Sequence, residues 1–273
     1  MKYFYNVELF YDGQNYFGWQ RQKDFKSIQG TVEAALEIIS PTSQKIRTMG
    51  SSRTDTGVHS RANICFIQLQ EDFTPSDLLE KLNSILPEDI RAKRCERTYS
   101  HYKVIYFAER KQYIYVFKNN NTPESSHYFH NIEEQLNIEK MKEAAKIFEG
   151  KHDFTNFCYK ASKNSEKVRE IFSCDIIEDQ KIITENDCLN SYALVIEGSG
   201  FLKQMVRIIM GTLINVGFGK TTIEDIQESL STTEFRKTGF IAPGAGLYLN
   251  RIDFIRDPFK GLKSKKKKNE ATN

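Results

Sequence analysis

The sequence predicts an α+β fold built from two similar halves. Segments rich in aromatic and β-branched residues, which are typical of strands, alternate with segments whose apolar residues keep helical spacing. The first half reads strand, helix, strand, helix, strand, and the second gives a similar mixture, although the letters show no internal repeat. This alternation indicates helices packed on a sheet rather than a helix bundle. We divide the chain into residues 1–106, residues 107–256 and a basic tail at residues 257–273.

In the first half, caps and prolines mark the helix boundaries. An amphipathic segment ends just before Pro41. Thr74 is suited to cap a second helix because Pro75 occupies its first position, and Pro87 ends it. A segment dense in Tyr, Phe, Val and Leu opens the chain as a strand. The expected elements are strands at residues 3–11, 62–69 and 90–97, and helices at residues 28–39 and 75–86.

In the second half, an alternating strand places Tyr113 and Tyr115 on one face. Gly150 is a suitable residue to follow a helix end. Thr222 and Asp225 form the spacing of a capping box for a later helix. The expected elements are strands at residues 107–117, 167–177, 191–197 and 247–255, and helices at residues 138–148, 201–211 and 222–230.

Charge is concentrated at the C-terminus of the sequence. The 273 residues carry a net charge of +3. The tail from Asp257 holds six lysines and two acidic residues, so the preceding 256 residues carry about −1. We therefore expect any nucleic-acid-binding surface to be local, and the Lys-rich tail to be a disordered, solvated end. No run of residues approaches the length of a membrane span.

Cysteine and histidine spacing argues against disulfides and metal ions. The five cysteines are scattered, and none forms a Cys-x-x-Cys pair. One His-x-x-His occurs, at His127 and His130, without a carboxylate or thiolate partner nearby in sequence. We expect no metal site, and a reducing, cytoplasmic location.

The most informative polar stretch is residues 50–60, Gly-Ser-Ser-Arg-Thr-Asp-Thr-Gly-Val-His-Ser, which leads into an apolar strand. Gly57 and the small residues allow the backbone to turn sharply and to approach another segment closely. Asp55 would lie at the rim of a sheet, with Arg53 two residues before it. A nearby guanidinium favours the ionised carboxylate, which can act as a nucleophile or a general base. On this tripeptide alone, a simple turn remains the alternative.

A second informative stretch is residues 198–211, which begins Gly-Ser-Gly and continues as an expected helix that is apolar almost all round. Such a helix is typically buried. Arg207 lies in the middle of this expected helix, and a buried cation without a partner is costly. We therefore expect a carboxylate against Arg207, either a structural one or Asp55.

Four motifs resemble those of the TruA-type tRNA pseudouridine synthases, in the same order along the chain. They are residues 11–22 with 29–33, residues 53–59, residues 200–211 and residues 242–249. The resemblance extends from about residue 3 to residue 255. Where the family often has Gly or Ala, this chain has Ser52, Thr56 and Ser60, which are small-for-small changes that should preserve the loop.

The resemblance implies two α+β lobes of ferredoxin-like topology, whose mixed, largely antiparallel sheets join around a central RNA-binding cleft. It implies isomerisation of uridine to pseudouridine in tRNA without a metal or small-molecule cofactor. The expected target is the anticodon stem-loop at positions 38–40, with other tRNA or RNA positions as the alternative. It also implies that the protein forms a homodimer. The expected binding partner is tRNA, and no membrane association is expected.

The resemblance also implies roles for individual residues. Asp55 would be the catalytic carboxylate, and Arg207 would pair with it and keep it charged. Tyr113 would stack on uracil and assist removal of the proton at C5. Arg53 would help to take the base out of the stack. Substrate contacts are expected from Arg53, Thr54, His59 and Tyr115.

Two other classes of protein are weighed against this interpretation. Residues 55–57 spell the Asp-Thr-Gly triplet of aspartic proteases, but the polar residues before Asp55 do not match the apolar strand that precedes those triplets. Arg53 would also oppose the proton that such paired carboxylates share. The other alternative is an RNA-binding protein that keeps the fold without catalysis.

Overall fold

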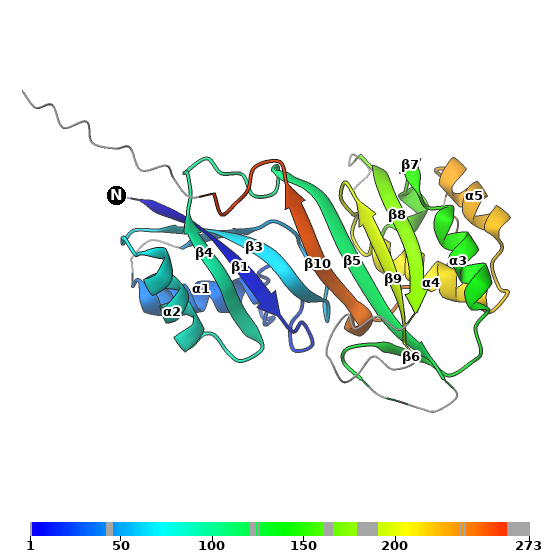
Figure 1. Cartoon of the computed structure of the whole chain (residues 1–273), viewed down its shortest axis with the longest axis horizontal. Helices are drawn as coiled ribbons and strands as arrows, with labels where there is room; N and C mark the ends of the chain where they lie inside the picture. The colour runs from blue at the N-terminus through cyan, green and yellow to red at the C-terminus, as the bar shows by residue number, and fades with distance from the viewer. Residues whose placement is uncertain are drawn as a thin grey trace, which may run out of the picture.

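The computed structural model describes residues 2–41, 46–120, 124, 126–160, 166–178, 191–234, 236 and 239–260. Within them the α+β class is confirmed, because helices pack on one large, mostly antiparallel sheet of ten strands (Figure 1). The strands are β1 Tyr3–Tyr11, β2 Arg47–Gly50, β3 His59–Leu69, β4 Ile90–Arg97, β5 Ala108–Asn119, β6 His130–Ile132, β7 Gly150–Asp153, β8 Val168–Glu178, β9 Ser191–Gly198 and β10 Leu247–Phe254. The helices are α1 Ile28–Ile39, α2 Pro75–Ile85, α3 Ile138–Lys146, α4 Met205–Gly217 and α5 Ile223–Ser231, with short 3-10 helices at Thr155–Phe157 and Gly244–Gly246.

One strand order occurs twice in the sheet. The main path is β4-β1-β3-β10-β5-β9-β8-β7, and β2 pairs with β3 off this path. The first half therefore has the order β4-β1-β3-β2, and the second half has the order β10-β5-β9-β8, with antiparallel neighbours in both. The two sets meet where β10 pairs with β3 in parallel, through Tyr248 with His59 and Leu249 with Ser60.

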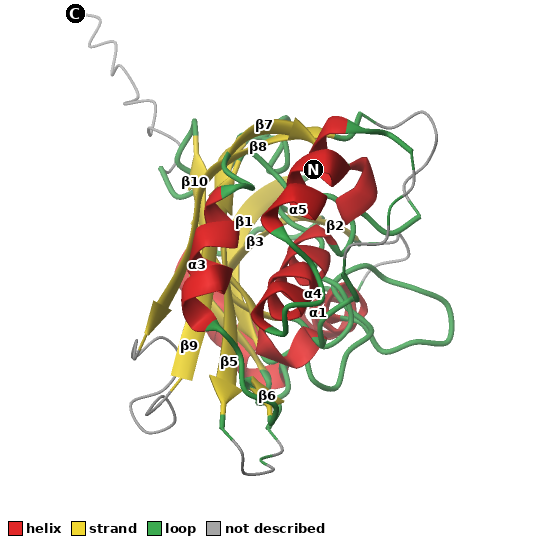
Figure 2. Ribbon diagram, turned by 90° about the vertical axis from the view of Figure 1, so that its right-hand side faces the viewer, coloured by secondary structure: helices red, strands yellow, loops and turns green. Residues whose placement is uncertain are grey.

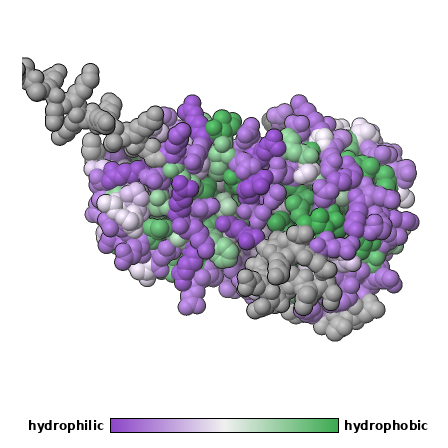
Figure 3. All heavy atoms as spheres, in the orientation of Figure 1, coloured by the Kyte–Doolittle hydropathy of each residue, from purple (hydrophilic) through white to green (hydrophobic). Residues whose placement is uncertain are grey.

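Two hydrophobic cores lie under the two sets of strands. One core packs β1 and β3 against α1 and α2 and includes Trp19 and Leu36. The other packs β5, β8 and β9 against α3 and α4 and includes Tyr115 and Met210. Figure 2 shows α1, α4 and α5 to one side of the strands. The face of the molecule that Figure 3 shows is largely hydrophilic.

Local signals predicted the boundaries of α1, α2, α3 and α5 to within two residues. Thr74 and Thr222 both cap helices as expected, and the reciprocal hydrogen bonds of Thr222 with Asp225 are present. The short strands β2, β6 and β7 were not predicted, because three or four residues carry too little alternation to be recognised. The helix expected at residues 201–211 spans Met205–Gly217 instead. Its start is shifted because Gln204 before it has a left-handed φ of 58°.

In the part of the chain described here, no helix is long and apolar enough to cross a bilayer. Of the expected tail at residues 257–273, the structure describes residues 257–260, where Phe259 is buried. The Lys-rich segment at residues 263–268 lies outside the described residues.

Candidate active site

Asp55 lies on the loop between β2 and β3, and other segments hold this loop through its backbone. The N–H of Trp19 donates to the carbonyl of Thr54 at 3.0 Å, and the N–H of Gly57 donates to the carbonyl of Tyr16 at 3.2 Å. Gly57 has a φ of 75°, a left-handed conformation that favours glycine. The loop that carries Asp55 is therefore fixed from both sides.

Three glycines from distant segments touch this loop so closely that any side chain would collide with a carbonyl oxygen. An ideal Cβ would lie 2.0 Å from the oxygen of Val58 at Gly13, 2.5 Å from that of Thr54 at Gly18, and 2.3 Å from that of Thr56 at Gly244. Since real Cβ atoms do not approach other atoms so closely, these positions require glycine. The motifs at residues 11–22 and 242–249 thus converge on the loop of Asp55.

The same loop lies where the two hydrophobic cores meet. Val58 belongs to the core of β5, α3 and α4, whereas Tyr11 and Trp19 belong to the core of β1, α1 and α2. The hydroxyls of Tyr11 and Thr54 share a hydrogen bond of 2.9 Å. Elements of both halves therefore determine where Asp55 is held.

The carboxyl of Asp55 faces the start of α4. It accepts from the backbone N–H of Gln204, and the positive charges of Arg207 and Lys203 act on it. Burial raises the pKa of Asp55 above its usual value, and the two cations and the N–H oppose that rise. A helix N-terminus also favours an anion. The site thus holds a partly buried carboxylate beside two cations.

Arg207 lies in the first turn of α4, and not in the middle of the helix as expected from the sequence. Its Nε donates to the carbonyl of Ala242 at 2.6 Å. Burial lowers the pKa of Arg207, and Asp55 and Tyr115 oppose this effect. Among the ion pairs within 4.0 Å in the described residues, none joins Arg207 to Asp55, so their interaction acts over a longer distance.

Tyr113 is buried beside the Asp55 loop. Its hydroxyl shares a hydrogen bond of 3.1 Å with Oγ of Ser52, and its ring packs edge-on against Phe201 at 5.2 Å between centroids. Burial raises the pKa of Tyr113, the bond to Ser52 lowers it, and the charge of Asp55 raises it further. The structure therefore brings Asp55 and Tyr113 into one electrostatic environment.

Tyr115 lies deeper in the same core and is fully buried. No hydrogen-bond partner for its hydroxyl is found among the described residues. Burial raises the pKa of Tyr115, and the positive charge of Arg207 opposes this. The hydroxyl of Tyr115 is therefore directed to the neighbourhood of Arg207 and not to the surface.

The remaining residues predicted to contact substrate differ in exposure. Arg53 is exposed on the loop, whereas Thr54 and His59 are buried. Nε2 of His59 lies 3.0 Å from the carbonyl oxygen of Ala245 and 2.8 Å from that of His127, and donates to them. Its ring stacks on Tyr248 at 4.6 Å.

His59 also binds the first loop of the chain through Nδ1, which is 3.0 Å from a carboxylate oxygen of Asp12. Burial raises the pKa of Asp12, but hydrogen bonds from His59 and the backbone N–H of Gln14 outweigh it and bring that pKa down to about 2. His59 therefore links the start of β3 to two distant segments.

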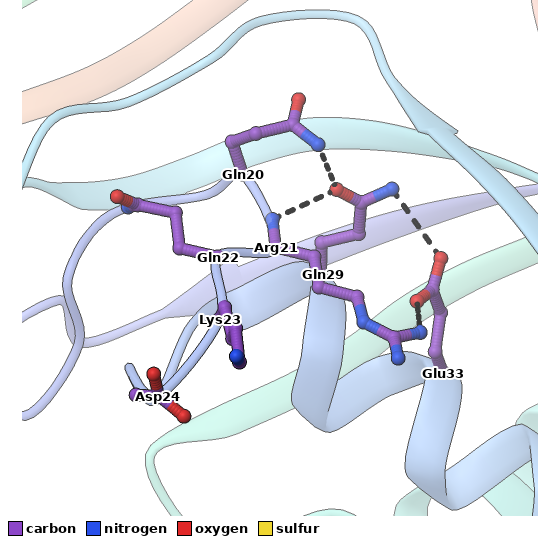
Figure 4. Close-up of a pocket in the computed structure, with 7 residues that line it drawn as sticks. All are labelled: Gln20, Arg21, Gln22, Lys23, Asp24, Gln29 and Glu33. Carbon is purple, nitrogen blue, oxygen red and sulfur yellow. Dashed lines mark hydrogen bonds and ion pairs between the residues drawn. The ribbon is translucent and has the colours of Figure 1, made fainter.

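A polar pocket is lined by residues 20–24 together with Gln29 and Glu33 of α1 (Figure 4). Gln29 joins its walls, because its Oε1 accepts from Gln20 at 2.7 Å and from the N–H of Arg21 at 3.0 Å. Glu33 also lines the pocket and is paired with Arg21 at 3.0 Å. The backbone N–H of Gln29 also donates to the carbonyl of Trp19 at 2.9 Å, so this network supports the segment that holds the Asp55 loop.

Sequence reasoning missed three groups at the site. Lys203 and the N–H of Gln204 act on Asp55, and Lys111 binds the loop next to it. The signal for Lys111 was present, because it precedes Tyr113 by two residues and so shares its face of the strand. Nothing in the sequence indicated the left-handed Gln204. Among the described residues, no cluster of three or more His, Cys, Asp or Glu side chains could hold a metal ion.

A family model and curated relatives point to one protein family. A family model described as tRNA pseudouridine synthase matches residues 10–106 and 144–254. The chain is 34% identical over 244 residues to tRNA pseudouridine synthase A of Thermoanaerobacter sp. strain X514, which covers 89% of this chain and 96% of that protein. It is 35% identical over 251 residues to the protein of the same name from Clostridium botulinum strain Eklund 17B, covering 90% and 98%.

A similarity to a solved structure is much weaker. The "Crystal Structure of a Cbf5-Nop10-Gar1 Complex" aligns with 10% identity and a TM-score of 0.33, covering 77% of this chain and 54% of that one. A similarity of this size does not decide the fold.

The matched family model and these relatives define an RNA-modifying enzyme of the isomerase class. Within that class, the chain belongs to the tRNA pseudouridine synthase family, and the resemblance to the TruA type is confirmed.

Proposed function

We propose that Asp55 is the catalytic carboxylate with which this chain converts uridine to pseudouridine in tRNA. The observation that carries the proposal is the position of Asp55, a partly buried carboxyl on a loop where distant motifs converge, facing two cations and a helix N-terminus. Arg207 and Lys203 favour its ionised form against the effect of burial. Only the ionised form can act as nucleophile or base.

The chemistry requires such a group. The reaction breaks a C–N glycosidic bond, turns the base and rejoins it to the sugar through C5. Asp55 could attack the sugar carbon, add to the base or remove a sugar proton, and each of these uses the same ionised carboxylate. Because the detached base stays in the site until it is rejoined, exclusion of water protects the intermediate from hydrolysis.

The target nucleotide must leave its stack before it can reach Asp55, at a cost of a few kcal/mol. We assign to Arg53 a contact with the everted nucleotide or with the space that it leaves. Its exposure two residues from Asp55 supports this assignment. Sequence-independent phosphate contacts by other Lys and Arg residues would hold the shape of the tRNA.

We further propose that Tyr113 stacks on uracil and receives the proton from C5. Its position beside the Asp55 loop and its bond to Ser52 support this role. For Thr54, His59 and Tyr115 we propose positioning roles, in place of the substrate contacts expected from the sequence. Thr54 bonds to Tyr11, His59 binds Asp12 and the carbonyl of Ala245, and Tyr115 lies near Arg207. Tyr115 would hold Arg207, and His59 would hold the two segments beside the loop.

The repeated strand order supports a description as two ferredoxin-like lobes, residues 1–106 and 107–256, joined around a tRNA-binding cleft. We propose that the enzyme acts as a homodimer in the cytoplasm on positions 38–40 of the anticodon stem-loop. Other tRNA or RNA positions are the alternative outcome of mapping pseudouridine in tRNA from cells with and without the gene.

Replacement of the carboxylate tests the proposal. We expect Asp55→Asn to lose tritium release from tRNA labelled at C5 of uridine, by at least about 10³-fold, because the residue acts directly on the substrate. Binding of tRNA, measured in parallel, should stay within a few-fold of the wild type. Full activity in this variant would refute the assignment. An inactive wild type that still binds tRNA would instead indicate a non-catalytic RNA-binding protein.

A further inference from the structure

A chain of hydrogen bonds runs from a buried lysine to the hydroxyl of Tyr113. Nζ of Lys111 donates to the carbonyl of Ser51 at 3.0 Å and to Oγ of Ser52 at 3.3 Å. Oγ of Ser52 and the hydroxyl of Tyr113 are 3.1 Å apart. Lys111 and Tyr113 are two residues apart on β5 and therefore lie on the same face of that strand.

We propose that Lys111 and Ser52 form a proton relay that makes Tyr113 a base. The proposal rests on the proposed function, in which the oxygen of Tyr113 receives the proton from C5. A neutral phenol is a poor base, and burial raises the pKa of Tyr113, so its hydroxyl proton needs an acceptor. The serine hydroxyl is the group that can pass this proton on.

The relay balances protons and electrons. Once deprotonated, Nζ of Lys111 presents a lone pair to Oγ of Ser52 and no longer donates to it. Nζ then takes the hydroxyl proton of Ser52, Ser52 takes that of Tyr113, and the oxygen of Tyr113 takes the proton from C5. The C5–H bond breaks and its electron pair forms the C5–C6 double bond of the product. The π electron pair of the C6=N1 double bond, which is present once C5 is bonded to the sugar, moves to N1. N1 then accepts a proton from water. Lys111 then returns its proton to water, so the enzyme is unchanged.

The surroundings of Lys111 suit an amine that loses its proton easily. Burial and the positive charge of Arg169 on β8 lower the pKa of Lys111 to about 8. Its neighbours across the sheet are Gly198 on β9 and Ile252 on β10, which carry no charge.

Three other charged side chains on neighbouring positions of the sheet do not face Lys111. Glu197, with its cationic partners Arg110 and Arg251, belongs to the opposite face of the sheet, because it neighbours Gln112 and not Tyr113. Around Tyr113, the titratable groups that act on it are Asp55 and Tyr11.

The proposal predicts how two variants behave. Lys111→Arg keeps a positive charge but cannot be deprotonated. Ser52→Ala keeps Lys111 and removes the link to Tyr113. In single-turnover reactions, wild-type pseudouridine formation should rise with pH and level off near pH 8. Both variants should be slower at pH 8.5, by about 10²-fold, which is typical of a lost acid–base group.

A substrate deuterated at C5 separates the relay from a structural role. In both variants, removal of the C5 proton should become rate-limiting, so the deuterium isotope effect should increase relative to the wild type. A Lys111→Arg enzyme with the wild-type rate, or a slower one without a larger isotope effect, would overturn the relay. Ser52→Ala decides the question in the same way if Lys111→Arg does not fold. Asp55→Asn serves as a separate control, because its activity tests the proposed function and not the relay.

Discussion

Two carboxylates in the first half of the chain are each associated with an arginine from another segment, and they differ in how fully they are satisfied. Glu33 on α1 accepts from Arg21 at 3.0 Å and from Nε2 of Gln29 at 3.3 Å (Figure 4). It also accepts from Oγ1 of Thr48 at 2.8 Å. Asp55 has one backbone N–H, and its cations act from beyond ion-pair distance.

The difference indicates what each carboxylate is for. The oxygens of Glu33 are occupied by donors within the protein, which is typical of a buried charge that holds a structure together. Asp55 keeps acceptor capacity and has a raised pKa, and a perturbed carboxyl of this kind is typical of functional sites. The comparison predicts that changes at the Asp55 loop reduce activity, whereas changes at Glu33 reduce stability.

Apart from replacement of Asp55 itself, the largest expected effect comes from displacing the Asp55 loop. Gly18 has a φ of 85°, and a Cβ there would lie 2.5 Å from the carbonyl oxygen of Thr54. We expect Gly18→Ala to lower kcat by about 10²-fold, because a shift of about 1 Å in a catalytic group has that consequence. Single-turnover rates of pseudouridine formation provide the measurement.

Gly219→Ala is the matched control for this experiment. Gly219 also has a left-handed φ, of 68°, but a Cβ there would meet nothing within 4 Å. It should keep the wild-type rate while it introduces the same kind of backbone strain. Equal losses in the two variants would mean that strain and not the contact with Thr54 is responsible, and the loop would then not be held as we describe.

The comparison also shows how far sequence could predict the site. The turn at Gly57 and the caps at Thr74 and Thr222 depend on neighbouring residues, so local pattern was sufficient for them. The bond between Ser52 and Tyr113 joins residues 61 apart in sequence, and no local signal reports such a contact. The first-turn position of Arg207 depends on the conformation of Gln204, which a polar side chain does not specify.

An intermediate effect is expected at Glu33. Glu33→Gln removes the charge paired with Arg21 and presents an NH₂ group to neighbours that are donors. We expect the free energy of unfolding to fall by about 1–3 kcal/mol, the usual cost of unsatisfied buried polar groups. The kcat should stay within a few-fold at a temperature where the variant is folded. Glu37→Gln, at an exposed position of the same helix, is the control, and equal stability of the two variants would contradict a structural role for Glu33.

The smallest expected effect is a gain in stability at Asp55, and it has a definite pH dependence. Since the folded-state pKa of Asp55 is above its unfolded value, folding favours the protonated form, and this stability is lost as pH rises through the folded-state pKa. Asp55→Asn should therefore have the same Tm as the wild type near pH 4 and a higher Tm at pH 7 to 8.

Asp12→Asn provides the opposite sign under the same conditions. The pKa of Asp12 falls to about 2, so its ionised form stabilises the fold above the unfolded pKa, and this stability is lost as pH decreases toward 2. The Asp12→Asn variant should have a lower Tm than the wild type at neutral pH, by an amount that shrinks in acid.

If Asp55→Asn instead lowered the Tm at neutral pH, Arg207, Lys203 and the N–H of Gln204 would outweigh burial. Asp55 would then resemble Glu33, a carboxylate stabilised by its surroundings, and the physical distinction between the two regions would be lost.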